Sequence, residues 1–350
     1  MQALARHVPR LAARIPWVSL GDWPTPLTSV LLEGAPVWIK NEGVSNPHYG
    51  GNKIRTLEVW FGHARERGAK RIWTIGAYGS NHAIATVLHA PTAGLEAGAI
   101  VFPQPASTWA VENCSALLAS ECPLIRLRSV AEVPFAGLWL ARRDRDAIVM
   151  PPGGATPLGA FGAVSAVFEL AEQIEAGLAP PPRRIVVAIG STCTTAGLLA
   201  GIALAHAAGV WRWPAPTIHG VRVTPWPVTS RLRIAELAAR TLAHAERLGG
   251  PRVRIGLDEL YRRLVVDAKE LGWGYGRPTQ RALRAIETVS SIRLDGVYSA
   301  KAAAAMLRLH RAGEGPLLFW ATKSATVLSS ATLERLREAP PRIRRWLQNA

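Results

Sequence analysis

A lysine follows two glycines and an asparagine in the segment Tyr49-Gly50-Gly51-Asn52-Lys53, directly before a stretch with helical character. Paired glycines let the backbone approach a ligand closely or adopt positive φ angles. A lysine at a helix start opposes the helix dipole, and surface lysines of this kind are common. If Lys53 is buried instead, its pKa falls, and the neutral amine can attack a carbonyl to form a Schiff base. Lys53 is therefore a candidate nucleophile, with a surface lysine as the alternative.

A second polar segment, Gly79-Ser80-Asn81-His82, follows an apolar run and precedes an apolar helical stretch. Serine and asparagine side chains and free main-chain N–H groups at a helix start form a site for anions. The same residues are also common N-caps, and from these residues alone we favour a cap by Ser80 or Asn81.

The third segment places Ser191-Thr192-Cys193-Thr194-Thr195 after Gly190, between an apolar run and an Ala/Leu-rich stretch. Hydroxyl groups and free N–H groups at a helix N-terminus suit a phosphate. The segment is not a Walker A loop, because no Gly-Lys-Ser/Thr ends it. Since the flanking residues read as buried, we favour a phosphate-binding loop over a solvated turn.

Strand-like and helix-like segments alternate along the whole chain, which predicts an α/β fold with parallel sheets covered by helices on both faces. In such sheets ligands bind beyond the carboxyl ends of the strands, where the second and third polar segments fall. Pro91 predicts an early end for the helix that follows His82. We expect strands over 37–40, 71–75, 99–102, 124–128, 184–189, 218–223 and 317–320, and helices over 53–67, 83–88, 108–118, 158–177, 195–208, 230–248, 279–290 and 301–312.

The composition is that of a globular protein, with 49% apolar and 19% charged residues among 350. The net charge of +16 comes mostly from arginine, since only six of the 41 basic residues are lysines. These arginines are spread along the chain without a helix-turn-helix, a zinc finger or interleaved aromatic residues. We therefore expect no specific nucleic-acid binding, although the charge can attract small anions.

Residues 1–20 carry arginines and no acidic residue, which is typical of a transit peptide; the alternative is a short exposed helix. Two windows, 75–95 and 185–210, lack charge and are long enough to span a membrane. Polar clusters divide each of them, so we expect strand, loop and buried helix in a protein without membrane segments. The cysteines (Cys114, Cys122 and Cys193) lack metal-ligand spacing, which indicates no metal site and suits the reducing cytoplasm.

Further segments complete an ordered set from about residue 7 to residue 330: Asp-Trp-Pro-Thr-Pro-Leu at 22–27, Pro-Gly-Gly-Ala-Thr-Pro-Leu-Gly at 152–159, Gly-Tyr-Gly at 274–276 and Asp-Gly-Val-Tyr at 295–298. In this order the motifs resemble the fold-type-II pyridoxal-phosphate enzymes, within them the D-cysteine desulfhydrase and 1-aminocyclopropane-1-carboxylate deaminase group. The resemblance implies a homodimer with pyridoxal 5′-phosphate between two α/β domains. The small domain, 53–162, would be inserted in a large domain formed by 1–52 and 163–350.

The resemblance also implies a role for each matching residue. Lys53 would hold the cofactor as a Schiff base and later move the α-proton of the substrate. Ser80, Asn81 and His82 would bind the substrate carboxylate, with Asn81 also on the phenolic oxygen of the cofactor and Ser80 able to exchange a proton. The remaining positions would be phosphate ligands (Ser191, Thr192, Cys193, Thr194 and Thr195), residues on the substrate face (Tyr275 and Tyr298) and the partner of the pyridine nitrogen (Ser299).

Ser299 separates the chemistries found in this group. A carboxylate at this position keeps the ring nitrogen protonated and makes the cofactor a strong electron sink. The deaminases have a glutamate there, whereas desulfhydrase-like members have a hydroxyl residue, as this chain does. His82 is also more similar to the desulfhydrases. The resemblance therefore implies β-elimination that yields a 2-oxo acid and ammonia.

The chain departs from the group at three positions, which marks it as a divergent member. Cys193 stands where the phosphate loop has a glycine, and Lys323 and Ser324 replace two glycines near the cofactor. We expect Lys323 to point to solvent, as lysines usually do; an inward Lys323 would add charge beside the ring. Lys301 is a weaker candidate for the cofactor lysine. The alternatives left open are cyclopropane ring opening, β-replacement, racemisation and a catalytically silent binding protein.

Overall fold

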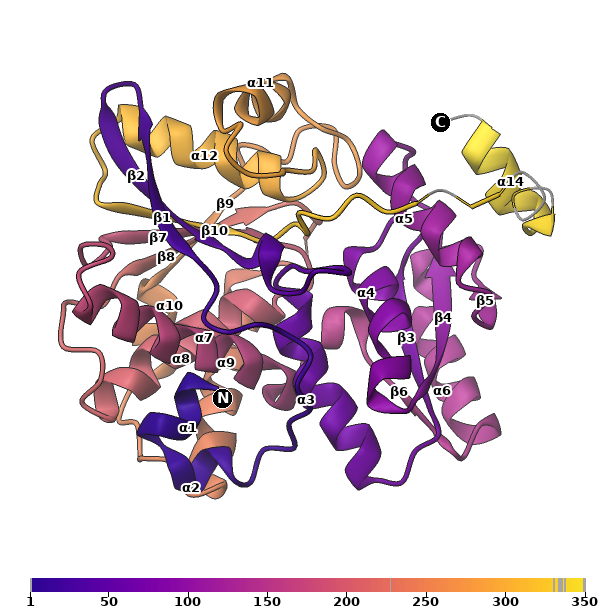
Figure 1. Cartoon of the computed structure of the whole chain (residues 1–350), viewed down its shortest axis with the longest axis horizontal. Helices are drawn as coiled ribbons and strands as arrows, with labels where there is room; N and C mark the ends of the chain where they lie inside the picture. The colour runs from indigo at the N-terminus through magenta and orange to yellow at the C-terminus, as the bar shows by residue number, and fades with distance from the viewer. Residues whose placement is uncertain (1, 227, 330, 333–335, 337, 349–350) are drawn as a thin grey trace.

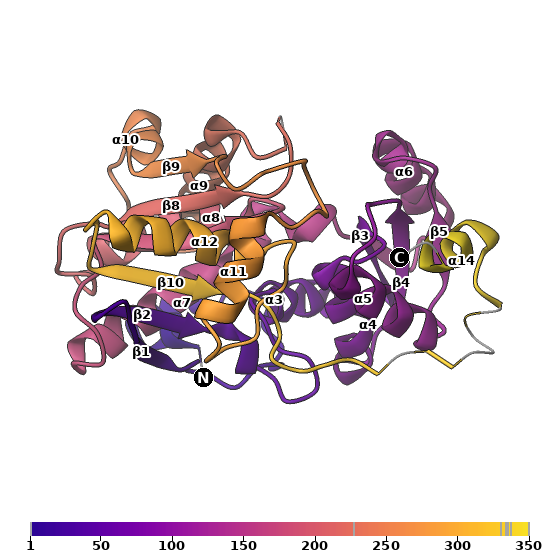
Figure 2. The same cartoon turned by 90° about the horizontal axis from the view of Figure 1, so that it is seen from above.

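The strands form two separate sheets in the computed structural model, which describes residues 2–226, 228–329, 331–332, 336 and 338–348. Both sheets are visible in Figures 1 and 2. All neighbouring strands pair in parallel except β1 and β2, so the expected α/β fold with parallel-sheet cores is confirmed. The larger sheet has the order β1 (Leu27–Leu32), β2 (Ala35–Asn41), β10 (Leu317–Ala321), β7 (Arg184–Ile189), β8 (Thr217–Arg222) and β9 (Leu264–Asp267), and the smaller one the order β5 (Leu124–Arg126), β4 (Glu96–Phe102), β3 (Arg71–Ala77) and β6 (Ala147–Val149).

Helices cover both faces of the larger sheet because alternate side chains of its strands point to opposite sides. Ile185, Val187 and Ile189 of β7 join one apolar core, whereas Val186 joins another. The first core includes α7 (Pro157–Glu175), α8 (Cys193–Ala207) and α9 (Arg231–Arg247), and the second includes α11 (Gln280–Thr288) and α12 (Ser299–Arg311) (Figure 1). The short α10 (Leu257–Arg262) precedes β9.

The smaller sheet is covered in the same way. Its first face packs against α3 (Lys53–Glu66), α4 (Asn81–His89), α5 (Thr108–Ala119) and the C-terminal α14 (Pro341–Gln348), and its second face against α6 (Val133–Arg143). Helix α4 ends at His89, before Pro91, as predicted. Short 3₁₀ turns complete the described elements: η1 (Glu42–Val44), η2 (Pro91–Ala93), η3 (Val130–Glu132) and η4 (Pro152–Gly154).

The two charge-free windows fold as predicted. Residues 75–95 contain the end of β3, a polar turn and α4, and residues 185–210 contain most of β7, a polar loop and α8. Helix α8 is buried from Cys193 to Ala205, which agrees with the absence of charged residues on any of its sides in this range. Among the described residues, no helix is long and apolar enough to cross a membrane.

The N-terminal segment differs from the expected exposed helix. Its two short helices, α1 (Ala3–His7) and α2 (Pro9–Ala12), bury Leu4 and Leu11 in the core beside α7. The antiparallel β1 was also not predicted; it joins β2 through Glu33 and Gly34, which both have positive φ angles (50° and 84°). A two-residue turn of this kind suits a hairpin.

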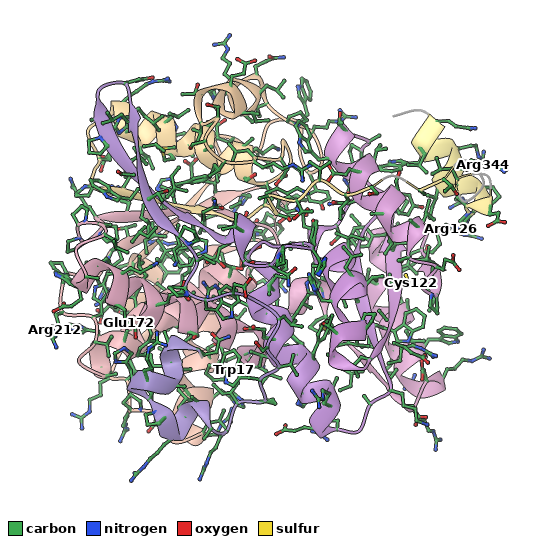
Figure 3. All side chains as sticks on the ribbon, viewed as in Figure 1. Trp17, Cys122, Arg126, Glu172, Arg212 and Arg344 are labelled. Atoms are coloured by element: carbon green, nitrogen blue, oxygen red, sulfur yellow. The ribbon has the colours of Figure 1, made fainter. Side chains whose placement is uncertain are left out.

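Exposed arginines occur far apart on the molecule. Figure 3 places Arg126 and Arg344 at one end and Arg212 at the opposite end. The excess positive charge is therefore not confined to one end of the protein.

Helix α3 lies between the two sheets. Its Val59 belongs to the core of the larger sheet, whereas Leu57 and Phe61 belong to the core of the smaller one. The division into a small domain over 53–162 and a large domain over 1–52 and 163–350 stays a prediction. Lys53 stands at the first position of this shared helix.

Candidate active site

A cavity of about 590 Å³ opens where the carboxyl ends of β3 and β7 face each other. Its volume is ordinary for a cofactor or small-ligand site. Among the described residues that line it, none is Asp or Glu, whereas Lys53 and Arg128 both line it. The cavity therefore favours anionic ligands. Its lining includes Lys53, Ser80, Asn81, His82, Ser191, Thr192, Thr194, Thr195, Tyr275 and Tyr298, so ten of the twelve site residues selected from the sequence meet there.

Lys53 projects into this cavity from the start of α3. Its Nζ lies 3.5 Å from Ser191 Oγ, and burial lowers the pKa of Lys53 from its usual 10.5. Asn52, which precedes it, donates from Nδ2 to Thr194 Oγ1 at 2.8 Å, so the start of α3 is tied to the start of α8. The depressed pKa favours the neutral amine, which is the form that attacks carbonyl groups.

Gly153 provides the space in front of the lysine. It has a positive φ of 66°, and a Cβ built on it would lie 2.0 Å from Ser191 Oγ and 3.6 Å from Lys53 Nζ. A larger residue at position 153 would therefore collide with Ser191, and this glycine keeps the approach to Lys53 open.

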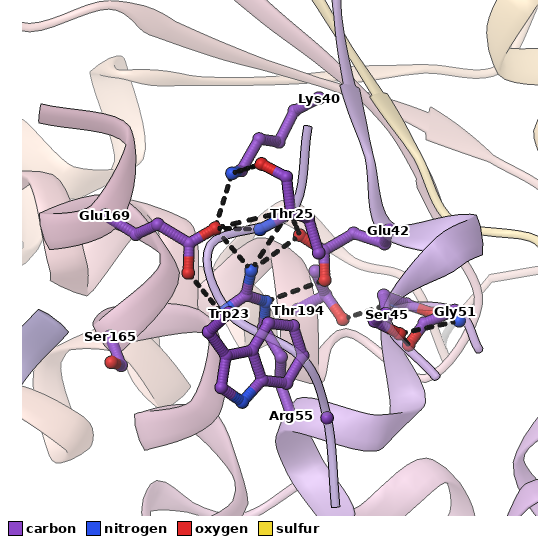
Figure 4. Close-up of polar contacts among 12 residues, drawn as sticks. Trp23, Thr25, Lys40, Glu42, Ser45, Gly51, Arg55, Ser165, Glu169 and Thr194 are labelled. Atoms are coloured by element: carbon purple, nitrogen blue, oxygen red, sulfur yellow. Dashed lines mark hydrogen bonds and ion pairs between the residues drawn. The ribbon is translucent and has the colours of Figure 1, made fainter. Parts of the chain in front are cut away.

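A buried network of charges holds the first turn of α3 (Figure 4). Arg55 donates to Glu42 and Glu169, and Lys40 forms a further ion pair with Glu169. Attraction to Arg55 and Lys40 lowers the pKa of Glu169 to about 2 despite its burial. Arg55 thereby ties α3 to η1, through Glu42, and to α7, through Glu169.

The loop before α8 contains a strained residue. Thr192 has φ 75° and ψ −23°, a left-handed conformation that β-branched residues rarely adopt. The helix begins at Cys193, and the N–H groups of its first turn have no partner within the helix. Cys193 is absent from the described lining, because its Sγ lies buried 3.5 Å from the carbonyl oxygen of Gly154. Its side chain therefore points away from the described cavity.

Ser80 is both a helix cap and a cavity residue. Its Oγ accepts a hydrogen bond from the N–H of Ala83 at 3.2 Å, which confirms the cap favoured from the residues alone. The next residue, Asn81, accepts at Oδ1 from Tyr49 Oη at 3.0 Å and from Asn113 Nδ2 at 2.8 Å. No described residue accepts a hydrogen bond from Asn81 Nδ2, so this donor is available to a ligand in the cavity that Asn81 lines.

His82 is buried, and neither of its ring nitrogens has a hydrogen-bond partner among the described residues. Burial, together with the nearby charge of Lys53, holds the pKa of His82 well below 6.5. A buried polar group without a partner costs free energy, and such groups are rare unless a ligand satisfies them. His82 therefore indicates a bound ligand in this cavity.

Tyr275 and Tyr298 also line the cavity. Their hydroxyl oxygens lie 2.5 Å apart, and burial raises the pKa of Tyr275 to about 12. Lys301 supports the loop that carries Tyr275, since its Nζ donates to the carbonyl oxygens of Leu271 (2.9 Å) and Gly274 (3.1 Å). Lys301 is not among the described residues that line the cavity, and its amine is held by these two carbonyl oxygens. Lys53 is therefore the better candidate for the cofactor lysine.

Ser299 does not line the described part of the cavity. Its Oγ accepts from the N–H of Asp295 at 2.7 Å and lies 3.0 Å from Asp295 Oδ2, to which it donates. The hydroxyl is therefore engaged at the start of α12.

The two positions after β10 correct one expectation. Lys323 is 2% exposed, so the prediction that it points to solvent is wrong. Its Nζ donates to Asn81 Oδ1 at 3.0 Å and lies 3.4 Å from Asn113 Oδ1. Ser324 Oγ accepts from the N–H of Gly50 at 3.0 Å and so holds the glycine pair before Lys53. The described residues contain no cluster of three or more His, Cys, Asp or Glu suited to a metal.

Comparisons with known proteins agree with this geometry. Residues 18–317 match the family model described as pyridoxal-phosphate dependent enzyme. The nocardicin C-9′ epimerase of Nocardia uniformis subsp. tsuyamanensis is 32% identical over 89% of this chain and 93% of its own, and a D-cysteine desulfhydrase of Salmonella paratyphi A is 29% identical over 90% and 96%. The crystal structure of a 1-aminocyclopropane-1-carboxylate deaminase homologue covers 94% of this chain, with 96% of its own, at a TM-score of 0.73 and 29% identity. The chain therefore belongs to the pyridoxal-phosphate dependent enzyme family.

Proposed function

We propose that this protein is a lyase that removes a β-substituent and the amino group from a small amino acid, yielding a 2-oxo acid and ammonia. The observation that carries the proposal is Lys53, an amine of lowered pKa in a cavity without a described acidic residue. A thiol-bearing amino acid of the D-cysteine type is the substrate class we favour, because one relative is named a D-cysteine desulfhydrase. The resemblance also implies a hydroxyl residue at position 299 in enzymes of that kind.

The residues present fit pyridoxal phosphate. The first turn of α8 offers N–H groups and the hydroxyls of Thr194 and Thr195 to a phosphate. Gly153 leaves space in front of Lys53. The ring nitrogens of His82, which have no hydrogen-bond partner among the described residues, can bind a ligand there. These features lie around one cavity, so a phosphate at α8 and a carbonyl at Lys53 can belong to one molecule.

The cofactor, when bound, supplies the electron sink for bond cleavage at the amino-acid carbon. In our proposal Lys53 accepts the α-proton at Nζ, for which the amine must be neutral; burial lowers the pKa of Lys53 in that direction. The Cβ–S bond then breaks with its electron pair leaving on sulfur, and the sulfur takes up a proton. The neutral hydroxyls of Tyr275 and Tyr298 face the same cavity and are our candidates for supplying that proton.

Binding of the substrate carboxylate is assigned to Ser80, Asn81 and His82 at the start of α4. The free N–H groups of this helix turn and its positive dipole end favour a carboxylate. We also assign Ser299 as the neutral partner of the cofactor nitrogen; its hydroxyl forms a hydrogen bond with Asp295 in this structure. A homodimer in the cytoplasm is part of the proposal; the described free cysteines, Cys114, Cys122 and Cys193, suit a reducing compartment.

Epimerisation is the second candidate, because a relative named as an epimerase is 32% identical to this chain. In that reaction a proton leaves one face of the α-carbon and another is added from the other face. Lys53 and Ser80 come from different helices and both line the cavity, so the pair provides two groups for such an exchange.

One set of measurements tests both candidates. The absorbance of the purified protein is recorded before and after borohydride, and the reduced adduct is mapped by peptide mass. We expect a cofactor band that borohydride removes, an adduct on Lys53 and no such band in Lys53→Ala. Lys70→Ala, a variant at an exposed lysine, should behave as wild type.

A panel of D- and L-amino acids then assigns the reaction. Release of 2-oxo acid and sulfide from a cysteine enantiomer supports β-elimination. Loss of optical activity without 2-oxo acid supports epimerisation instead. A cofactor band in Lys53→Ala, or no reaction with any amino acid of the panel, would contradict the proposed function.

A further inference from the structure

Lys323 is a buried amine that joins the two halves of the protein. It follows β10, a central strand of the larger sheet, yet its Nζ contacts Asn81 of α4 and Asn113 of α5, which cover the smaller sheet. It also lies 5.6 Å from the ring centre of Tyr49, within range of a cation–π contact. Three side chains thus surround this one amino group.

No carboxylate neutralises this amine among the described residues. The groups with an electrostatic influence on Lys323 are Asp295, Glu112 and Arg293, and Glu112 forms its ion pair with Arg293 at 2.5 Å. Burial lowers the pKa of Lys323, an effect that Asp295 opposes. Burial of an amine against neutral oxygens lowers the stability of the folded protein. A functional role for Lys323 would explain why the amine is present in spite of this cost.

The contacts around Asn81 define that role. Asn81 Oδ1 faces three donors: Lys323 Nζ at 3.0 Å, Tyr49 Oη at 3.0 Å and Asn113 Nδ2 at 2.8 Å. Asn113 is itself oriented, because its Nδ2 also donates to the carbonyl oxygen of Gly79 at 2.9 Å. Asn81 also lines the cavity, so Nδ2 is the end of its carboxamide that stays available for a ligand there.

We propose that Lys323 is a positioning residue that fixes Asn81 with its Nδ2 donor toward the cavity and favours an anionic oxygen there. Lys323 is absent from the described lining, so it acts through Asn81 and not by touching a ligand. A positive charge behind the carboxamide also polarises it and strengthens the N–H donor. The inference rests on the proposed function and on the role that the resemblance implies for Asn81, a contact with the phenolic oxygen of the cofactor.

Lys323→Met tests the inference, because methionine keeps an unbranched side chain and removes the amine. We expect the dissociation constant of the cofactor to rise about tenfold, the cost of one charged hydrogen bond. The pH at which the absorbance of the bound cofactor changes should rise by about one unit, because a nearby positive charge no longer disfavours protonation. The melting temperature of the cofactor-free protein should stay the same or rise.

Two matched variants isolate the cause. Tyr49→Phe removes another donor to the same Oδ1 without a change in charge, so it should leave the absorbance midpoint in place. Lys70→Met removes an exposed lysine and should match wild type in every measurement.

The inference is overturned if Lys323→Met has wild-type cofactor affinity and midpoint. It is also overturned if melting temperature and affinity fall together with an unchanged midpoint, since Lys323 would then be a purely structural residue. Failure of the proposed function looks different: the wild-type protein would show a normal cofactor spectrum and titration but no turnover of any amino acid.

Discussion

The hydroxyl oxygens of Tyr275 and Tyr298 lie 2.5 Å apart although the two residues come from separate segments, the loop after β9 and the start of α12. Burial raises the pKa of both phenols, that of Tyr275 to about 12. Both are therefore neutral at physiological pH, and each can donate only one proton. In the proposed function the pair would therefore act as a single proton-donating unit beside the cavity.

Replacing either tyrosine with phenylalanine should lower kcat by about 10²-fold, the usual size of a lost acid–base group. The double variant should be no slower than the slower single variant, because residues that act as a unit are not additive. Steady-state kinetics of the three variants check this, with the cofactor spectrum as a control for site integrity. Multiplicative losses would show that the phenols act independently.

Glu169→Gln should destabilise the protein by about 3 kcal/mol or more, because it breaks a buried pair and leaves Arg55 and Lys40 undercompensated. The native pKa of Glu169 is about 2 against an ordinary 4.5. Its contribution is therefore complete above pH 4.5 and is lost as the pH falls toward 2, by about 1.4 kcal/mol per unit. Urea unfolding of both proteins between pH 2.5 and pH 7 measures the difference.

Glu172→Gln is the matched control on the same helix, because Glu172 pairs with Arg6 at the surface. We expect a loss below about 1 kcal/mol for this variant. Equal losses for Glu169→Gln and Glu172→Gln would contradict the importance of the buried network.

Thr192→Gly should raise the melting temperature of the cofactor-free protein, because the left-handed conformation at φ 75° costs a residue with a Cβ about 1 kcal/mol. Thr192→Ala keeps a Cβ at this positive φ angle and removes the hydroxyl together with the methyl group. A comparison of the two by thermal unfolding and cofactor titration separates backbone strain from phosphate binding. If glycine lowers the stability, Thr192 is not strained.

The lowered pKa of Lys53 makes the stability of the cofactor-free protein depend on pH. The unfolded chain binds the lysine proton up to about pH 10.5, whereas the native protein releases it at lower pH. The unfolding free energy should therefore rise with pH through this window. Other buried lysines contribute in the same direction, so the test is the difference between wild type and Lys53→Met from pH 7 to pH 10. A difference that is constant with pH would show an ordinary pKa.

The sequence predicted best what depends on local pattern. Strand β7 has the predicted bounds because its run of branched apolar residues ends at a glycine, and ten selected site residues meet because strand ends share one edge. Short β6 and β9 were missed, since three or four half-buried residues carry little pattern. Helix α6 was missed because it exposes Phe135 and Leu138, which blurs the helical periodicity.

The direction in which the side chain of Lys323 points could not be predicted from the residues around it in the sequence. Its partners, Asn81 and Asn113, lie more than 200 residues earlier in the chain, so only the tertiary fold brings them together. Ser299 is a different case, because its partner Asp295 lies only four residues earlier and this local contact competes with the role that the resemblance implies. A long-range contact therefore sets the direction of the Lys323 side chain, whereas a local contact engages the Ser299 hydroxyl.

Helix α3, which begins at Lys53, contacts both halves of the fold. Its first turn is fastened to α7 by Arg55 and Glu169, while its later residues, Leu57 and Phe61, belong to the core of the smaller sheet. The turn that carries the amine of Lys53 is therefore anchored to the larger sheet by a buried ion pair, while the remainder of the same helix is packed against the smaller sheet.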